Sequence, residues 1–68
     1  MRISARNVLK GKIVDVTKGA TTAHVRIDVG CTIVTSSITN AAVDELKLAP
    51  GKDAYAVIKA SDVMVGVD

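Results

Sequence analysis

The chain has almost no aromatic residues, because its 68 residues include no Trp, no Phe and a single Tyr, Tyr55. Proteins that bind single-stranded nucleic acid stack bases on several aromatic side chains, at about 1–3 kcal/mol per base. One Tyr cannot provide such a surface, and a net charge of +2 is too small for the electrostatic attraction on which those affinities depend. We therefore expect no nucleic-acid partner.

Cysteine and histidine are equally scarce, with Cys31 and His24 as the only examples. A lone cysteine excludes a disulfide within the chain, and one Cys with one His is too few for a structural zinc site. No nucleophile stands near a base and an orienting group at a spacing that enzymes use. We therefore expect neither metal-ion ligands nor catalytic activity, with His24 on a polar surface and Cys31 as a small residue in a turn.

Long apolar runs are also absent. No segment approaches the roughly 20 apolar residues that span a bilayer, and the segment Met1–Asn7 has no apolar stretch of the kind found in signal peptides. A chain with one thiol and no export signal is typical of the cytoplasm. The expected location is therefore cytoplasmic, with no membrane partner.

What the chain does have is a high hydrophobic fraction, 49%, in a very short sequence. A chain of this length buries only about 60% of the surface that it exposes when unfolded. Small scaffolds commonly add disulfides, a metal or association to become stable, and only association is open to this sequence. We expect one domain, residues 1–68, that forms a homo-oligomer.

The pattern of apolar residues predicts five strands. The clearest is Thr22–Val29, in which apolar and polar residues alternate strictly, as in a half-buried antiparallel strand. Gly11 lies inside the first strand, where a glycine usually marks a bulge or bend. The predicted strands are Asn7–Thr17, Thr22–Val29, Cys31–Ile38, Ala54–Ala60 and Val63–Val67.

One short helix is predicted between the third and fourth strands, over Ala41–Leu46, with Thr39 or Asn40 as its N-cap. Pro50 and Gly51 end the connection that follows. Five strands with one helix in this position is the element order of an all-β, five-stranded OB-type barrel. A five-stranded barrel of another connectivity fits the same pattern.

Small hydroxyl residues stand near cationic residues at several predicted element boundaries, where backbone N–H groups are often free. Such donors together suit a tetrahedral dianion, because charge-assisted hydrogen bonds are the stronger ones. The alternative is that the serines cap turns and Lys59 is a solvated strand residue, and composition alone leaves both open. The residues concerned are Ser4–Asn7, Thr39 and Lys59–Ser61.

The motifs of the chain resemble those of the molybdenum-pterin-binding protein family, also called molbindins or Mop domains. The same module is similar to accessory domains of molybdate-responsive regulators and molybdate-transport ATPases. The resemblance extends over nearly the whole chain, and its opening motif is the most specific part. It rests on Ser4-Ala5-Arg6-Asn7, Leu9-Lys10-Gly11, Lys18-Gly19, Thr35–Thr39, Val43 with Glu45-Leu46, Gly51-Lys52 and Lys59–Met64, in family order.

The resemblance implies an OB-type barrel, a homohexamer built as a trimer of dimers, and molybdate as the bound oxyanion, with tungstate as a close mimic. It also implies sites at the dimer interface. In these sites, hydroxyl groups and backbone amides donate to the anion, Lys59 balances its charge, and Asn7 supports the loop. The role of Arg6 stays open between side chain and backbone. The implied residues are Ser4, Ala5 and Arg6 of one subunit, meeting Thr39, Lys59, Ala60 and Ser61.

A second kind of site near a threefold axis is also implied by the resemblance, and the turn Lys18-Gly19-Ala20-Thr21 is its candidate. One departure concerns the turn at Gly30-Cys31, where family members often have a longer Gly-Gly-Asn-type hairpin. This difference lies away from the residues assigned to the anion, and it bears on contacts between subunits.

The sequence therefore predicts intracellular storage or buffering of molybdate by an oligomer. A molybdate-dependent sensor or interaction module acting on a separate protein is the first alternative. A single-stranded nucleic-acid-binding barrel and a protein that binds a pterin are further alternatives, and the lack of aromatic residues weighs against both.

Overall fold

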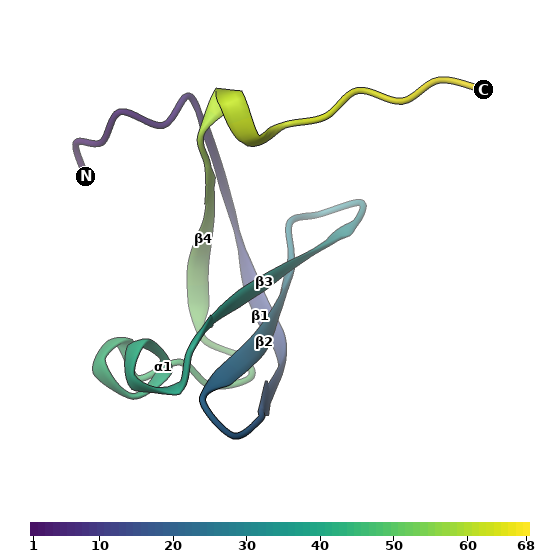
Figure 1. Ribbon diagram of the computed structural model, residues 1–68. Coiled ribbons are helices and arrows are strands. Elements are labelled where there is room, and N and C mark those ends of the chain that lie inside the picture. The colour runs from purple at the N-terminus through teal and green to yellow at the C-terminus, as the bar shows by residue number, and fades with distance from the viewer.

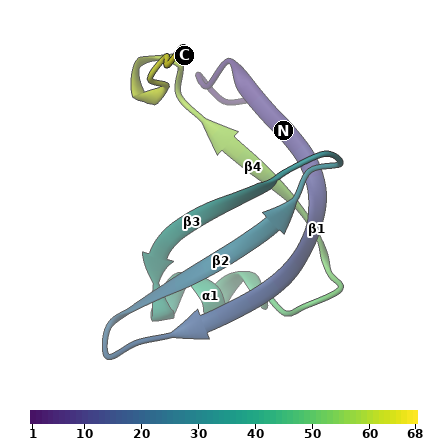
Figure 2. The ribbon, with the colours of Figure 1, turned by 90° about the vertical axis from the view of Figure 1, so that its right-hand side faces the viewer.

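The computed structural model describes residues 1–68 and contains four strands, one α-helix and one 3-10 turn (Figure 1). The strands form a curled antiparallel sheet in the order β3-β2-β1-β4 (Figure 2). The chain is thus all-β apart from its short helix, which lies between the third and fourth strands as predicted. The elements are β1 (Asn7–Lys18), β2 (Thr22–Asp28), β3 (Ile33–Thr39), α1 (Asn40–Leu46), β4 (Asp53–Ile58) and η1 (Ala60–Asp62).

The alternation in β2 places every second residue of that strand in the core. The intervening residues, His24 among them, are exposed, so the predicted face of this strand is confirmed. The core is small because only six residues are buried. They are Ala23, Val25 and Ile27 of β2, Ile13 of β1, Val43 of α1 and Ala56 of β4.

Gly11 serves a different purpose from the predicted bulge. The irregularity of β1 falls between Ile13 and Asp15, so the extra residue is Val14. A Cβ atom on Gly11 would lie 2.2 Å from the backbone oxygen of Asp28. The missing side chain therefore lets β1 pass close to the end of β2 at the point where β1 continues alone with β4.

The turn between β2 and β3 is longer than predicted. Gly30 has a φ of 119°, which favours glycine, and its N–H donates to Oδ1 of Asp28 over 2.9 Å. The backbone N–H of Val29 donates to the oxygen of Thr32. Cys31 is therefore an exposed turn residue, and β3 begins at Ile33 instead of Cys31.

Helix α1 begins directly after Thr39, whose Oγ1 accepts a hydrogen bond of 3.0 Å from the backbone N–H of Ala42. Thr39 is therefore the N-cap, one of the two predicted. The helix ends at Lys47, which has a left-handed backbone with φ 54°. The ammonium of Lys52 donates to the last carbonyls, those of Leu46 and Lys47.

The predicted fifth strand, Val63–Val67, is wrong. This segment pairs with no strand and leads away from the body of the molecule (Figure 1). Its four large apolar side chains are between 50% and 94% exposed. The composition of this segment is typical of a strand, but a strand needs a neighbour whose backbone groups pair with its own. The turn η1 directs the chain away from β4 after Ile58, so this segment has no such neighbour within the chain. The predicted fourth strand is shortened for the same reason, because Lys59 and Ala60 belong to this turn.

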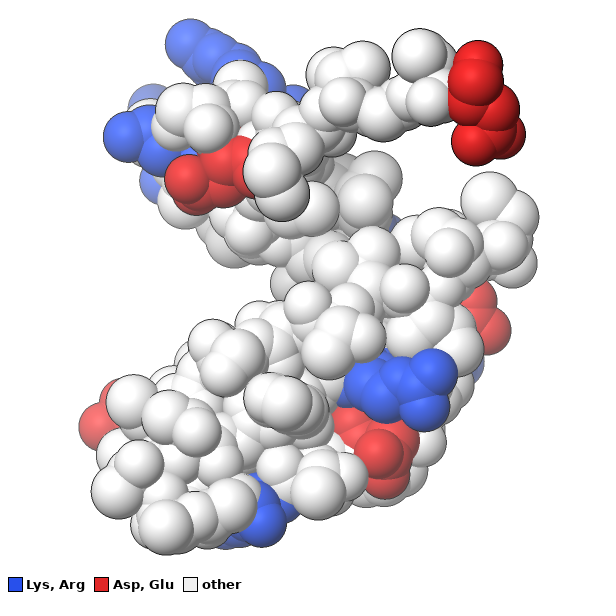
Figure 3. Space-filling view, turned by 45° about the vertical axis from the view of Figure 1, so that its right-hand side comes forward, with Lys and Arg blue, Asp and Glu red and all other residues white.

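Without a fifth strand the five-stranded barrel does not close, and β3 and β4 are the free edges of the sheet. The concave side leaves an apolar groove of about 710 Å³, and most of its lining residues are hydrophobic. The space-filling view shows the molecule deeply indented between its terminal segments and the body of the sheet (Figure 3). The groove is lined in part by Ile13, Val34, Ile38, Leu48, Tyr55 and Ile58.

The close approach at Gly11 gives the first prediction. Gly11→Ala would force β1 and Asp28 apart, and overpacking of this kind costs typically about 1–3 kcal/mol. The free energy of unfolding from urea denaturation should fall accordingly. Lys10→Ala, at an exposed neighbouring position, is the control and should change it by less than about 0.5 kcal/mol. Equal midpoints for both variants would contradict the role assigned to Gly11.

Candidate functional site

The pairing of β1 with β4 brings two of the predicted site segments to one end of the sheet. Asn7, the first residue of β1, pairs with Ile58, the last residue of β4, and its Nδ2 donates to the oxygen of Ile58 over 3.3 Å. The segment Ser4–Arg6 precedes this pair and Lys59–Ser61 follows it. Both segments therefore emerge from adjacent strands, and Figure 1 shows them at the same end of the molecule. Asn7 links the two strands at this junction through its side chain.

The two segments together have many hydrogen-bond donors that are bonded to no acceptor of the chain. The hydroxyls of Ser4 and Ser61 are exposed and make no hydrogen bond within the chain. No acceptor of the chain is bonded to the backbone N–H groups of Ser4, Ala5, Arg6, Ala60 and Ser61.

The cations of this end are also unpaired. The ion pairs of the chain are Lys12 with Asp53 and Lys18 with Asp44, so neither Arg6 nor Lys59 has a carboxylate partner. Lys and Arg side chains are visible on the upper part of the molecule in Figure 3. Free hydroxyls, free amides and two unpaired cations together suit an oxyanion with several acceptor oxygens.

Thr39 does not join these residues within one chain. It pairs with Thr22, and β2 begins beside the last residues of β1, Lys18 among them. Thr39 therefore lies at the opposite end of the twelve-residue strand β1 from Ser4 and Lys59. A site that contains both groups requires two copies of the chain.

The turn of the predicted second site lies at the Thr39 end. The backbone N–H of Gly19 donates to the oxygen of Thr22 over 2.7 Å, and the side-chain ammonium of Lys18 donates to Oδ1 of Asp44 over 2.6 Å. The charge of Lys18 is thus balanced by α1, while the N–H groups of Ala20 and Thr21 have no acceptor in the chain. This turn therefore offers an anion fewer charged donors than the other end.

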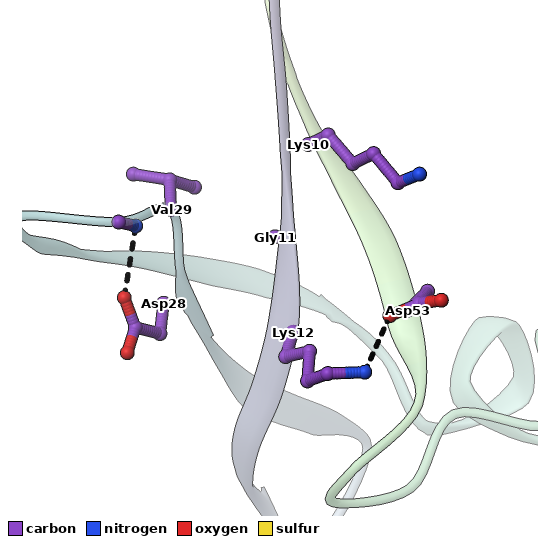
Figure 4. A pocket seen from close by; sticks show the side chains of 7 residues that line it. Lys10, Gly11, Lys12, Asp28, Val29 and Asp53 are labelled. Carbon is purple, nitrogen blue, oxygen red and sulfur yellow. Dashed lines mark hydrogen bonds and ion pairs between the residues drawn. The ribbon is translucent and has the colours of Figure 1, made fainter.

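A shallow polar pocket of about 380 Å³ lies where β1 leaves β2, and sequence reasoning did not identify it (Figure 4). The positive charges of two lysines and the negative charges of two aspartates cancel in this pocket. Lys12 donates to Asp53 over 2.7 Å, and this contact lowers the pKa of the Asp53 carboxyl below its usual value. The pocket therefore has little attraction for an anion. It is lined by Lys10, Gly11, Lys12, Asp28, Val29, Gly30 and Asp53.

Two contacts of α1 were also missed. The side chains of Asn40 and Asp44 reach the turn between β1 and β2. Sequence reasoning considered Asn40 only as a helix cap, and no sequence signal indicates the bond of its side chain to Gly19.

The His, Cys, Asp and Glu side chains are spread over the chain. No three of them are gathered so that they would hold a metal ion. None of the helical segments has both the length and the apolar character needed to cross a bilayer.

The chain is similar to proteins named for molybdenum. A family model described as the TOBE domain matches residues 3–65. The chain is 54% identical to the probable molybdenum-pterin-binding protein of Haemophilus influenzae, over the full length of both.

Two solved structures have the same fold. A molybdate-binding protein from Sporomusa ovata is 33% identical with a TM-score of 0.93, over 98% of this chain and 100% of that one. The cytoplasmic molybdate-binding protein ModG, crystallised with molybdate bound, is 46% identical with a TM-score of 0.95. That match covers the whole of this chain and 49% of ModG.

The cap of α1 gives the second prediction. Thr39→Val removes the acceptor for the N–H of Ala42 and should lower the free energy of unfolding of the ligand-free protein by about 1 kcal/mol. Thr39→Ser keeps the oxygen and should stay within a few tenths of a kcal/mol of the parent. Chemical denaturation measures both, and a Thr39→Val variant as stable as the parent would show that the cap bond does not form.

Proposed function

The chain belongs to the TOBE-domain family and within it to the molybdenum-pterin-binding proteins, and we propose that it binds molybdate as one domain, residues 1–68, without catalysing a reaction. The observation that supports this most is the meeting of Ser4–Arg6 with Lys59–Ser61 at one end of the sheet. Their donors suit the four oxygens and two charges of the anion. Tungstate has the same shape and charge and should bind in the same way.

Binding replaces the water around the dianion by a fixed set of protein donors. Burial strengthens each of these bonds because the local dielectric constant falls, but it also costs the hydration of the charge. The donors must therefore be numerous and partly charged. Ser4 and Ser61 supply hydroxyls, the backbone supplies amides, and Lys59 and Arg6 supply positive charge that no carboxylate of the chain balances.

The complete site in this proposal includes Thr39 of a second copy. The Oγ1 of Thr39 already accepts a bond from Ala42, but its O–H proton remains free to be donated, and the side chain is exposed. Because Thr39 lies at the far end of β1 from the other donors, a neighbouring copy has to bring it to them. The turn Lys18–Thr21 would form the second site, at contacts among several copies.

The apolar surface of the chain supports association. The core has only six buried residues, whereas the groove of about 710 Å³ and the apolar segment Val63–Val67 lie open. A free sheet edge accepts an added strand. We propose that Val63–Val67 of one copy pairs with a free edge of another and covers its groove, within a homohexamer that is a trimer of dimers.

Storage or buffering of molybdate in the cytoplasm is the role that we propose for this assembly. Its support is the description of the structurally similar ModG as a cytoplasmic molybdate-binding protein. A protein that buffers molybdate by itself needs several binding sites and no second protein. An oligomer of one chain with sites between its subunits has several sites and needs only copies of itself.

The third prediction concerns binding. At about 100 times its Kd, a ligand stabilises a protein by about 2.7 kcal/mol, and for a domain of this size that raises Tm by roughly 10–20 °C. We expect such a rise with sodium molybdate, measured by differential scanning fluorimetry with an external dye. Ser4→Ala combined with Lys59→Ala should remove most of it.

The matched control for this experiment is Ser37→Ala with Lys10→Ala, which removes the same groups from exposed strand positions. This control should respond to molybdate like the parent. A Ser4→Ala, Lys59→Ala variant with an undiminished rise would show that the anion binds elsewhere.

The fourth prediction concerns assembly. Removal of residues 63–68 deletes the apolar segment and should convert the oligomer to smaller species, because the free sheet edge and the groove lose their cover. Removal of Asp68 alone is the control and should leave the oligomer intact. Native mass spectrometry measures both, and a parent that stays a single copy would contradict the proposed assembly.

A further inference from the structure

Asn40 joins two parts of the molecule that lie at the Thr39 end of the sheet. Its backbone N–H donates to the oxygen of Thr21 over 2.9 Å, and its side-chain Nδ2 donates to the oxygen of Gly19 over 3.0 Å. Both acceptors belong to the turn between β1 and β2. One residue thus ties this turn to the first turn of α1 by two hydrogen bonds.

The other contact between the turn and the helix is weaker. Lys18 and Asp44 form an ion pair, but their side chains are 46% and 67% exposed. Exposed ion pairs add little to the ordering of a structure, because water competes for both charges. The hydrogen bonds of Asn40 are therefore the main contact that fixes the turn relative to α1.

The amide of Asn40 is only half satisfied. Its Oδ1 is buried and accepts no hydrogen bond, while Nδ2 is bonded to Gly19. A buried acceptor without a donor costs free energy, and such a group in a folded protein requires an explanation. The bond from Nδ2 to Gly19 therefore forms although Oδ1 of the same amide has no donor within the chain.

The residue directly before Asn40 is Thr39, the hydroxyl that the proposed site needs from a second copy. Thr39 is held on one side by its pairing with Thr22 and on the other by the bond from Ala42. Without the side-chain bond of Asn40 to Gly19, only the backbone bond to Thr21 and the exposed ion pair of Lys18 with Asp44 would tie the helix start to the turn. The orientation of the Thr39 hydroxyl would then vary, and an anion would have to fix it on binding.

We propose that Asn40 is a positioning residue for molybdate binding, whose side chain orders the Thr39 hydroxyl through its hydrogen bond to Gly19, whereas the bond to Thr21 comes from the backbone and remains in any variant with an N–H at this position. This inference rests on the proposed function, since it assigns Asn40 to the same site. Asn40 makes no contact with the anion and acts only through Thr39. Its contribution to affinity must therefore vanish when the Thr39 hydroxyl is absent.

A double-mutant cycle on the full chain tests this dependence, with molybdate affinity measured by calorimetric titration of the assembled protein. The variants are Asn40→Ala, Thr39→Val and the two combined. We expect Asn40→Ala and Thr39→Val each to weaken binding about five-fold or more, and the combination to bind no more weakly than Thr39→Val alone. Ser37→Ala, which removes an exposed hydroxyl from β3 outside the groove, is the control and should bind like the parent.

A merely structural role for Asn40 has a different outcome, in which Asn40→Ala lowers the Tm of the ligand-free protein but leaves the Kd unchanged. That result would overturn the proposal, and so would losses that add in the double variant. If Asn40→Ala does not fold, the cycle is run with Asn40→Asp, which keeps the side-chain size. Any simple charge repulsion by the introduced carboxylate would persist in the Thr39→Val background, whereas the positioning effect would disappear. A parent that does not bind molybdate would refute the proposed function itself, before this inference is reached.

Discussion

The pairing of β1 with two strands at once determines how the rest of the molecule is arranged. The second half of β1 pairs with β2, and its first half pairs with β4. The segments Ser4–Arg6 and Lys59–Ser61 therefore lie at one end of the strand, while the turn between β1 and β2, the end of β3 and the start of α1 lie at the other (Figure 2). Gly11 makes the change of partner possible because its missing side chain lets β1 pass the Asp28 carbonyl.

This arrangement has a consequence for function. One end of the sheet has hydroxyls, free amides and unpaired cations, and the other end has Thr39 with a free proton to donate. The same molecule exposes an apolar segment and an open apolar groove. Association would cover the apolar surface and complete the anion site in one step. An anion held between copies would in turn stabilise the assembly, because it binds only the state that contains both.

Much of the fold could be predicted from the sequence. The alternation in β2, the Thr39 cap and the position of the helix follow from side-chain patterns that act locally. The strand predicted over Val63–Val67 could not be judged in this way, because an apolar and β-branched pattern does not show whether a neighbouring strand is available for pairing, and none is within this chain. Gly11 was predicted to mark a bulge or bend; the bulge lies at Val14 instead, and the close approach of Gly11 to Asp28 could not be predicted because it depends on how the strands cross in space.

For the candidate site, the short motifs predicted the segments Ser4–Arg6 and Lys59–Ser61, and the structure brings these two segments to one end of the sheet. The ion pair of Lys18 with Asp44 and the side-chain bond of Asn40 to Gly19 could not be predicted from the sequence. In each case the two partners are more than twenty positions apart, and the contact forms only with a particular side-chain rotamer. Long-range contacts of polar side chains have no periodic signal. Such contacts can be identified only from a structure, which places the turn next to the helix.

The most direct measurement of the central claim is an anomalous diffraction map of crystals grown with molybdate, recorded at the molybdenum absorption edge. The account predicts a molybdenum peak within hydrogen-bond distance, through its oxygens, of Ser4 and Ser61 of one copy and of the Thr39 hydroxyl of its neighbour. Peaks confined to positions bounded by one chain, or no peak at the interfaces between copies, would contradict it.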